Sequence, residues 1–168
     1  MLTDLVQIKF LGEKMRPENE RFRKSMKVHG HNDKALRRIA EEVEEQIDCT
    51  QCANCCKVAT TTLNERDVER LAKYLRIPQA KFLAEYTNES ADEGRVLKRT
   101  KAAGCIFLDG NLCSVYEARP ETCQKFPHMV RGTGSIQSRM WQFIDRASYC
   151  PIVYNTMEAF KDELKFRR

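Results

Sequence analysis

The sequence has no long apolar run, few aromatic residues and few glycines. No stretch approaches the ~18 consecutive apolar residues that a membrane-spanning helix needs, so we expect no membrane partner. Aromatic residues make up 8% of the 168 residues, and glycine occurs 7 times. We recognise no phosphate loop, dinucleotide-binding loop, Ser–His–Asp arrangement or pair of carboxylates in an apolar setting. The common nucleotide-binding and hydrolytic sites are therefore not supported.

The N-terminal segment lacks the features of a secretory signal peptide. Residues 1–20 contain acidic residues and a very short apolar stretch, without a basic region or a cleavage site of small residues. A KDEL tetrapeptide occurs at Lys161–Leu164, but KFRR follows it, so we do not expect it to act as a C-terminal retention signal. We expect a cytoplasmic protein.

The sequence is rich in charge and in cysteine. Charged residues make up 32%, the mean hydropathy is -0.59 and the net charge is +5, which is typical of a polar globular protein of one domain. There are eight cysteines. Cytosolic thiols are kept reduced, so disulfides are a poor explanation for them. Eight is twice the number of ligands in a closed thiolate site, and the composition therefore predicts metal binding.

The spacing of the cysteines carries the chemistry. Four of them form a C-x-x-C-x-x-C-C run: Cys49, Cys52, Cys55 and Cys56. A C-x-x-C spacing lets the chain fold around a metal with both thiolates on one side, and the intervening amides can donate to sulfur. The other four come later in the chain: Cys105, Cys113, Cys123 and Cys150. All eight are predicted metal ligands.

Two metal sites are one way to group these ligands. If the segment around Cys55 and Cys56 is extended, the two side chains point to opposite sides and serve different sites. Cys49, Cys52 and Cys55 with the later Cys150-Pro151 are similar to a ferredoxin-type arrangement. Four cysteines would then make the second set: Cys56, Cys105, Cys113 and Cys123. The triple run favours an iron–sulfur cluster such as [4Fe–4S], and the later cysteines favour zinc, so the metal stays open.

The hydrophobic pattern predicts an α+β fold, a small metal-pinned domain with helices around a short antiparallel β-hairpin. An amphipathic helix is expected over 33–47, and a capped helix is expected after Asn64, with Asp67 completing the cap. A further helix follows Pro78. Strands are expected within 95–116 around an Asp109-Gly110-Asn111 turn, and a short helix carries Cys123. The spacing over 136–147 is helical but ambiguous. A last helix is expected from Asn155.

These elements predict a domain organisation in three parts. Residues 1–32 form an N-terminal arm, residues 33–152 form the cysteine-cluster metal-binding domain, and residues 153–168 form a C-terminal helix packed on that domain.

Some other residues have alternative interpretations. Arg119 could offset the negative charge of nearby thiolates or bond a carbonyl within its turn. Trp141 and Tyr149 are expected in the core. His128 is expected on a surface loop, with metal ligation as the alternative. His29 and His31 are expected to bind no metal.

The cysteine motifs resemble a known family. The C-x-x-C-x-x-C-C run, Cys105-Ile-Phe-Leu and the stretch from Cys113 through Arg119-Pro120 and Cys123 to Phe126-Pro127 are similar to the CxxCxxCC cysteine-cluster family, described as a zinc- or iron-chelating domain. The similarity extends from about residue 48 to residue 151. It implies metal chelation by the eight cysteines. The family usually has Arg after the last motif cysteine, where this chain has Gln124.

The function expected from this pattern is metal binding in a structural, storage or delivery role. The alternative is an iron–sulfur-dependent redox or methyl-transfer enzyme, because flagellin lysine N-methylase is similar in its cysteine pattern. This chain is short for that role and has no glycine-rich adenosylmethionine loop. A zinc-pinned module for a protein partner is a third interpretation. Nucleic acid is an unexpected partner because no basic second helix follows the capped helix.

Overall fold

The computed structural model describes residues 1–29, 33–101, 104–132 and 134–166. The chain divides into two compact units. Met1–Asp48 and Pro127–Arg168 make the first, which we call the helical unit. Cys49–Phe126 makes the second, which we call the cysteine unit. The cysteine unit is thus inserted into the sequence of the helical unit, and the domain predicted over 33–152 takes residues from both.

The described residues of the helical unit form helices joined by short loops. They are α1 (Leu5–Lys14), α2 (Arg16–His29), α3 (Asp33–Glu44), α9 (Ile136–Arg146) and α10 (Pro151–Glu163). Side chains cap two of these helices: Asp4 accepts from the Gln7 N–H, and Ser135 accepts from the Ser138 N–H. Pro151 suits the first turn of α10 because that position needs no N–H donor.

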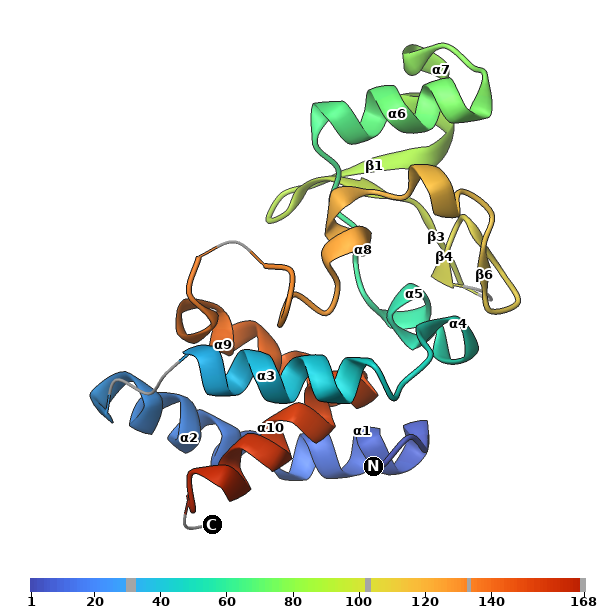
Figure 1. Ribbon diagram of the computed structural model, residues 1–168. Coiled ribbons are helices and arrows are strands. Elements are labelled where there is room, and N and C mark those ends of the chain that lie inside the picture. The colour runs from blue at the N-terminus through green and yellow to red at the C-terminus, as the bar shows by residue number, and fades with distance from the viewer. Residues whose placement is uncertain (30–32, 102–103, 133, 167–168) are drawn as a thin grey trace. The chain divides into compact units, whose positions relative to one another are not determined.

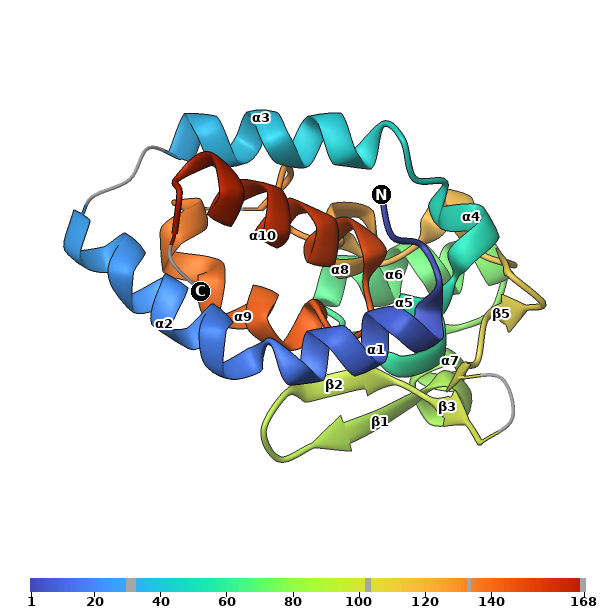
Figure 2. The same ribbon diagram turned by 90° about the horizontal axis from the view of Figure 1, so that it is seen from below.

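Helix α10 is the centre of the helical unit. It packs against α1, α3 and α9 (Figures 1 and 2). Its Phe160 is fully buried and meets Phe22 of α2 edge to face, with ring centroids 5.7 Å apart. Burying an aromatic or aliphatic side chain of this size contributes roughly 1.5–3 kcal/mol. The core of this unit is therefore apolar, built from one inward face of each helix.

A buried ion pair and a close helix contact are two further features of this unit. Lys161 is completely buried, and its Nζ lies 2.6 Å from Glu18 Oε1 and also contacts Glu158. A buried ammonium group needs such partners. At Gly12, an added Cβ would lie 2.5 Å from the Ala147 carbonyl oxygen, so only glycine lets α1 cross the end of α9 this closely.

The cysteine unit mixes short helices with short strands. Its helices are α4 (Cys49–Cys52), α5 (Asn54–Val58), α6 (Glu65–Leu75), α7 (Gln79–Tyr86), the 3-10 turn η1 (Tyr116–Ala118) and α8 (Glu121–Lys125). Its strands are β1 (Thr87–Ser90), β2 (Gly94–Leu97), β3 (Arg99–Thr100), β4 (Gly104–Cys105), β5 (Leu108–Asp109) and β6 (Leu112–Cys113). They pair antiparallel as β1–β2, β3–β4 and β5–β6.

The apolar core of the cysteine unit lies around α6 and α7. It contains Leu63, Val68, Leu71, Ala72, Phe82, Leu97, Phe107, Val115 and Ala118. The Tyr86 ring stacks between Phe82 and Phe107, with centroids 5.4 Å and 5.2 Å away. Helix α6 begins with a complete capping box between Asn64 and Asp67.

The α+β prediction is confirmed, as are several of its elements. The helix predicted over 33–47 is α3, which ends at Glu44 and buries Leu36, Ile39, Ala40 and Val43. The cap on α6, the break at Pro78 and the turn between β5 and β6 also agree with the pattern. The ambiguous segment over 136–147 is helix α9.

Other predictions are wrong. The last helix begins at Pro151 and not at Asn155, because Cys150 serves as its N-cap and Pro151 as its first residue. Trp141 is 62% exposed and is not a core residue, since it lies on the outer side of α9. Among the strands expected within 95–116, that of Cys105 does not flank the predicted turn together with that of Cys113, because β4 pairs with β3 and β5 pairs with β6. The pattern did not predict α1, α2 or β1.

Candidate metal centre

Seven of the cysteines lie in the cysteine unit. Cys49, Cys52, Cys55 and Cys56 lie in α4 and α5, Cys105 in β4, Cys113 in β6 and Cys123 in α8. Cys150 is buried at the N-cap of α10 in the helical unit. None of the eight, all of which are among the described residues, forms a disulfide. This arrangement leaves all eight sulfurs without a disulfide bond, as binding of a metal by thiolates requires.

The C-x-x-C-x-x-C-C run is helical and not extended. Ala53 joins α4 to α5 in the left-handed conformation, with φ of 47°. Cys55 and Cys56 are consecutive residues of α5. Consecutive helical side chains diverge by about 100° and not by 180°. The reason given above for placing Cys55 and Cys56 in separate sites is therefore wrong.

Cys56 has the most acidic thiol among the cysteines with shifted pKa values. A hydrogen bond from the Cys55 side chain lowers the pKa of Cys56 to about 7. The positive charges of Arg99, Lys57 and Arg119 also lower it, while burial opposes them. Since a metal binds the thiolate and not the thiol, this site favours the bound form of the sulfur.

Four of the cysteines are close enough to interact electrostatically: Cys56, Cys105, Cys113 and Cys123. Burial is the largest cause that raises the pKa of the other three, to about 12 for Cys123. In each case the negative charge of the Cys56 thiolate raises the pKa further. The charges of Cys105 and Cys113 also raise the pKa of Cys123. We call these cysteines the four-thiol set. Four thiolates without a cation would repel one another strongly.

The four-thiol set has hydrogen-bond donors aimed at its sulfurs. The backbone N–H of Phe107 donates to Cys105, and the N–H of Val115 donates to Cys113. In both cases the donor lies two residues after the cysteine. The Thr61 hydroxyl lies 3.8 Å from the Cys123 sulfur. Such donors stabilise thiolates and orient them around a metal.

Polar contacts hold the helix that carries Cys56. None of the described residues of α4 and α5 is fully buried. Arg99 of β3 donates to the carbonyls of Cys56, at 3.5 Å, and Lys57, at 2.5 Å, and also to that of Ala59. A Cβ at Gly104 would lie 2.6 Å from the Cys56 carbonyl oxygen, so β4 backs closely onto α5. The β3–β4 pair is therefore the support of α5.

A second polar link joins the cysteine run to the β5–β6 turn. Asn111 accepts from the Lys57 ammonium at 2.7 Å and donates to the Gln51 carbonyl at 2.9 Å. Asn111 was predicted only as a turn residue. Its contacts, like those of Arg99, depend on tertiary structure, and no pattern in the sequence indicates them.

Arg119 supports the first interpretation, in which its charge offsets that of nearby thiolates, whereas a bond from its guanidinium group to a carbonyl of its turn stays a prediction. Its guanidinium carbon lies 3.9 Å from the centre of the Tyr116 ring, and its charge lowers the pKa of Cys56 and Cys113. Its carbonyl accepts from Gln124, the residue at which this chain departs from the family pattern, at 2.7 Å.

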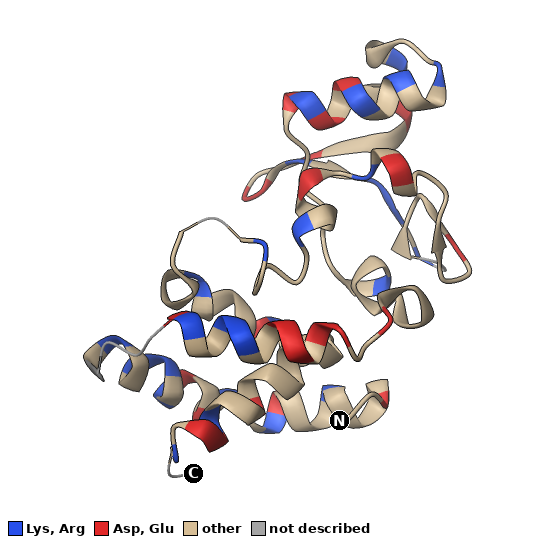
Figure 3. Ribbon diagram, in the orientation of Figure 1, with Lys and Arg blue, Asp and Glu red and all other residues tan. Residues whose placement is uncertain are grey.

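The two described histidines, His29 and His128, belong to the helical unit. His128 is a half-buried residue of the helical unit, and its φ of 69° is left-handed. His29 ends α2, and His31 lies outside the described residues. The acidic residues of 41–48 gather in the second half of α3 and the loop after it, directly before Cys49 in the chain (Figure 3).

Within the described residues, no three His, Cys, Asp or Glu side chains are already arranged as a metal site. A closed thiolate site would therefore need its sulfurs to come closer together, because a Zn–S bond is about 2.3 Å long. The donors suit zinc or iron, which accept sulfur ligands, and do not suit calcium or magnesium, which require oxygen. In the same described part of the chain, no helix is long and apolar enough to cross a bilayer.

Comparison with known proteins agrees with this donor chemistry. The sequence profile of the CxxCxxCC family, described as a "putative zinc- or iron-chelating domain", matches residues 48–151. The chain is also similar to an uncharacterized protein of Methanocaldococcus jannaschii, with 33% identity over 86 residues. The match covers 49% of this chain and 45% of that relative, so it spans less than half the length of either. No solved structure is significantly similar to this chain.

Proposed function

Because this chain belongs to the CxxCxxCC family of zinc- or iron-chelating domains, we propose that its eight cysteines bind zinc or iron as thiolates in one or two closed sites. The protein is then a metal-binding protein with a structural, storage or delivery role. A reducing compartment such as the cytoplasm suits this role, because it keeps the thiols from forming disulfides.

The four-thiol set is the observation that carries the proposal. Its members come from α5, β4, β6 and α8, so a shared ion would link elements that are 67 residues apart at their extremes, from Cys56 to Cys123. The Phe107 and Val115 amides and the Thr61 hydroxyl already point to three of the sulfurs. We therefore assign Cys56, Cys105, Cys113 and Cys123 to one site.

The remaining cysteines are proposed as ligands of a second site: Cys49, Cys52, Cys55 and Cys150. This grouping rests on their spacing, which is similar to that of a ferredoxin run followed by a Cys-Pro pair. Because the Cys55 and Cys56 thiols are hydrogen-bonded to each other, their contact is compatible with two adjacent sites and with one larger cluster that uses both.

Nearby cations support the binding of a metal with four thiolates. One Zn²⁺ with four thiolates carries a formal charge of −2, as does a [4Fe–4S]²⁺ cluster with four thiolates. Arg99, Lys57 and Arg119 act on Cys56 and would offset this charge. Once bound, the metal supplies folding free energy, of the order of 10 kcal/mol for a structural zinc site.

The same ligands favour an alternative function. An iron–sulfur cluster on these thiolates would support a redox or methyl-transfer enzyme related to flagellin lysine N-methylase. The test is to purify the protein without oxygen and to measure metal, acid-labile sulfide and the absorption spectrum. One or two zinc ions per chain without visible colour support the binding protein. About four irons and four sulfides with a broad band near ~400 nm support the alternative. Less than one metal per chain contradicts both.

The ligand assignment has its own test. Cys113→Ser should remove the metal of the four-thiol set, because a serine hydroxyl is a poor ligand for zinc or iron. Leu112→Ser is the matched control, since Leu112 is the neighbouring residue of β6 and is 65% exposed. The control should keep the metal content of the parent protein. Full metal content in Cys113→Ser would exclude Cys113 as a ligand.

A further inference from the structure

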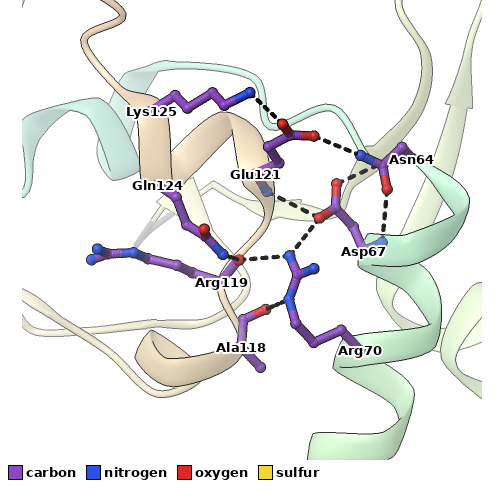
Figure 4. Close-up of polar contacts among 8 residues, drawn as sticks. All are labelled: Asn64, Asp67, Arg70, Ala118, Arg119, Glu121, Gln124 and Lys125. Carbon is purple, nitrogen blue, oxygen red and sulfur yellow. Dashed lines mark hydrogen bonds and ion pairs between the residues drawn. The ribbon is translucent and has the colours of Figure 1, made fainter. Parts of the chain in front are cut away.

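Helix α6 carries no cysteine, yet one of its side chains is bonded to the segment that leads to Cys123. Asp67 is 2% exposed, and its two carboxylate oxygens have different partners (Figure 4). Oδ2 accepts from the Asn64 N–H at 3.1 Å and completes the capping box of α6. Oδ1 accepts from the N–H of Glu121, the first residue of α8, at 3.0 Å. One oxygen thus accepts a hydrogen bond at the start of α6, and the other accepts one at the start of α8.

Helix α8 depends on this external acceptor. Its N-cap residue is Pro120, whose side chain has no polar atom that could accept from the first N–H groups of the helix. Asp67 therefore does for α8 what an N-cap side chain usually does from within the chain. Asn64 adds a bond from its amide to Glu121 Oε2 at 3.1 Å. The start of α8 is fixed from α6.

Arg70, one turn after Asp67, fixes the residues just before α8. Its Nη2 lies 2.5 Å from Asp67 Oδ1 and donates to the Arg119 carbonyl at 2.9 Å. Its Nε donates to the Ala118 carbonyl at 3.2 Å. The planar guanidinium group matches this set of acceptors, which a lysine ammonium could not match in the same way. Asp67 and Arg70 together bond the backbone at 118, 119 and 121.

This backbone segment contains Arg119, whose charge acts on the four-thiol set, and leads to Cys123, which is one of its members. The Arg119 guanidinium lies over the Tyr116 ring, and its charge lowers the pKa of Cys56 and Cys113. Cys123 follows two residues after Glu121 on α8, near the Thr61 hydroxyl. Any shift of the Ala118–Glu121 backbone would move both Arg119 and Cys123.

We propose that Asp67 and Arg70 are positioning residues of the metal centre, which hold the turn before α8 so that Cys123 and Arg119 are in place before the metal binds. The inference rests on the proposed function, because it assumes that Cys123 is a ligand. Fixing a ligand in advance lowers the entropy that metal binding must remove, so the effect should appear in metal affinity and release.

The test compares Asp67→Asn and Arg70→Met with the parent full-length chain. Zn²⁺ affinity is measured by competition with a chromophoric chelator, and Co²⁺ absorption reports the ligand geometry. Both variants should bind the same number of ions about tenfold or more weakly, as expected when a residue supporting a ligand is lost. Their thiolate-to-cobalt bands should shift because Cys123 is displaced. Glu65→Gln is the control, since Glu65 lies in the first turn of α6 and its side chain is 84% exposed.

Arg70→Lys guards against a variant that does not fold. It keeps the positive charge beside Asp67 but loses the planar guanidinium group that donates to two carbonyls. It should therefore weaken Zn²⁺ binding, but less than Arg70→Met does. A role limited to overall stability would lower the melting temperature of the metal-free chain and leave Zn²⁺ affinity and the Co²⁺ spectrum unchanged. That result in Arg70→Lys and Asp67→Asn would overturn the inference. A parent protein that binds no metal would instead overturn the proposed function.

Discussion

The helical unit and the cysteine unit are stabilised in different ways. The helical unit buries whole faces of α3, α9 and α10 around Phe22 and Phe160. The cysteine unit has an apolar core around α6 and α7, but α4, α5 and the two-residue strands β3 to β6 contribute little to it. Its thiol-bearing segments are held by Arg99, Asn111 and Asp67 through hydrogen bonds.

This difference indicates where a metal ion would matter. An isolated hydrogen bond contributes only about 0.5–1.5 kcal/mol net, and short strands have few of them. A structural metal site contributes about ten times as much. We infer that the helical unit stays folded by its apolar core, whereas the segments of the four-thiol set require the metal.

Metal removal should have the largest effect. Stripping the ion from the purified protein should expose the backbone amides of α4, α5, β4 to β6 and α8 to exchange, because up to roughly 10 kcal/mol of folding free energy is lost there. Amides of α9 and α10 should keep their protection. Hydrogen exchange with mass spectrometry on both forms measures this. Equal loss of protection in the two units would contradict the contrast.

Acid should release the metal steeply. Burial raises the pKa of Cys105, Cys113 and Cys123, so these thiols are protonated below pH 8 without metal and must each lose a proton to bind it. Zn²⁺ affinity should therefore fall about a thousandfold per pH unit as the pH drops from 8 to 6, which corresponds to three protons. Cys56, with a pKa of about 7, adds a further loss at the acidic end. Competition titrations at several pH values check the slope, and a slope of one proton or less would be incompatible with this set.

A cavity in the helical unit should affect that unit and leave the metal of the four-thiol set in place. Phe22 is 1% exposed and packs on Phe160 and Phe166. Phe22→Ala should destabilise the helical unit by about 3–5 kcal/mol. Thermal unfolding followed by circular dichroism, with metal content measured before and after, checks both parts. Loss of the metal at temperatures where the variant is still folded would contradict the claim that the metal of the four-thiol set does not depend on the apolar core of the helical unit.

Arg99 should have a smaller effect. Arg99→Gln removes the donor that bonds the carbonyls at the end of α5 and a charge that acts on Cys56. It should weaken Zn²⁺ binding about tenfold, the equivalent of about 1.4 kcal/mol. Arg95→Lys is a control, because Arg95 makes ion pairs with the exposed Glu65 and Glu89 and should change affinity by less than about 0.5 kcal/mol. An equal response of both variants would argue against a specific role for Arg99.

The sequence predicted the elements whose pattern is local. Helix α3 has apolar residues at helical spacing, and α6 begins with Asn64 and Asp67 at the spacing of a capping box. Helix α2 escaped prediction because charged residues dominate it, although Phe22 and Met26 are buried one turn apart. Strand β1 is polar along its length and is defined by its pairing with β2.

The cysteines of the candidate site could be proposed from the sequence, whereas the residues that hold their segments in place could not. The cysteines and Arg119 stand out by spacing and composition. The contacts of Arg99, Asn111 and Arg70 with backbone carbonyls join residues 40 to 60 positions apart, so no local pattern reveals them. The grouping of the cysteines stays a prediction, and its stated reason fails because α5 is a helix. The directions of neighbouring side chains follow from the sequence only when the local conformation is known.

The most direct test of the central claim uses a variant that keeps only the four-thiol set. Cys49, Cys52, Cys55 and Cys150 are replaced by serine in the full chain, and the metal-free protein is titrated with Co²⁺ in the absence of oxygen. We predict one ion per chain, with intense thiolate-to-cobalt absorption and the visible bands of a tetrahedral site. The absence of thiolate-to-cobalt absorption, or binding without a defined stoichiometry, would contradict the claim that Cys56, Cys105, Cys113 and Cys123 form one metal site.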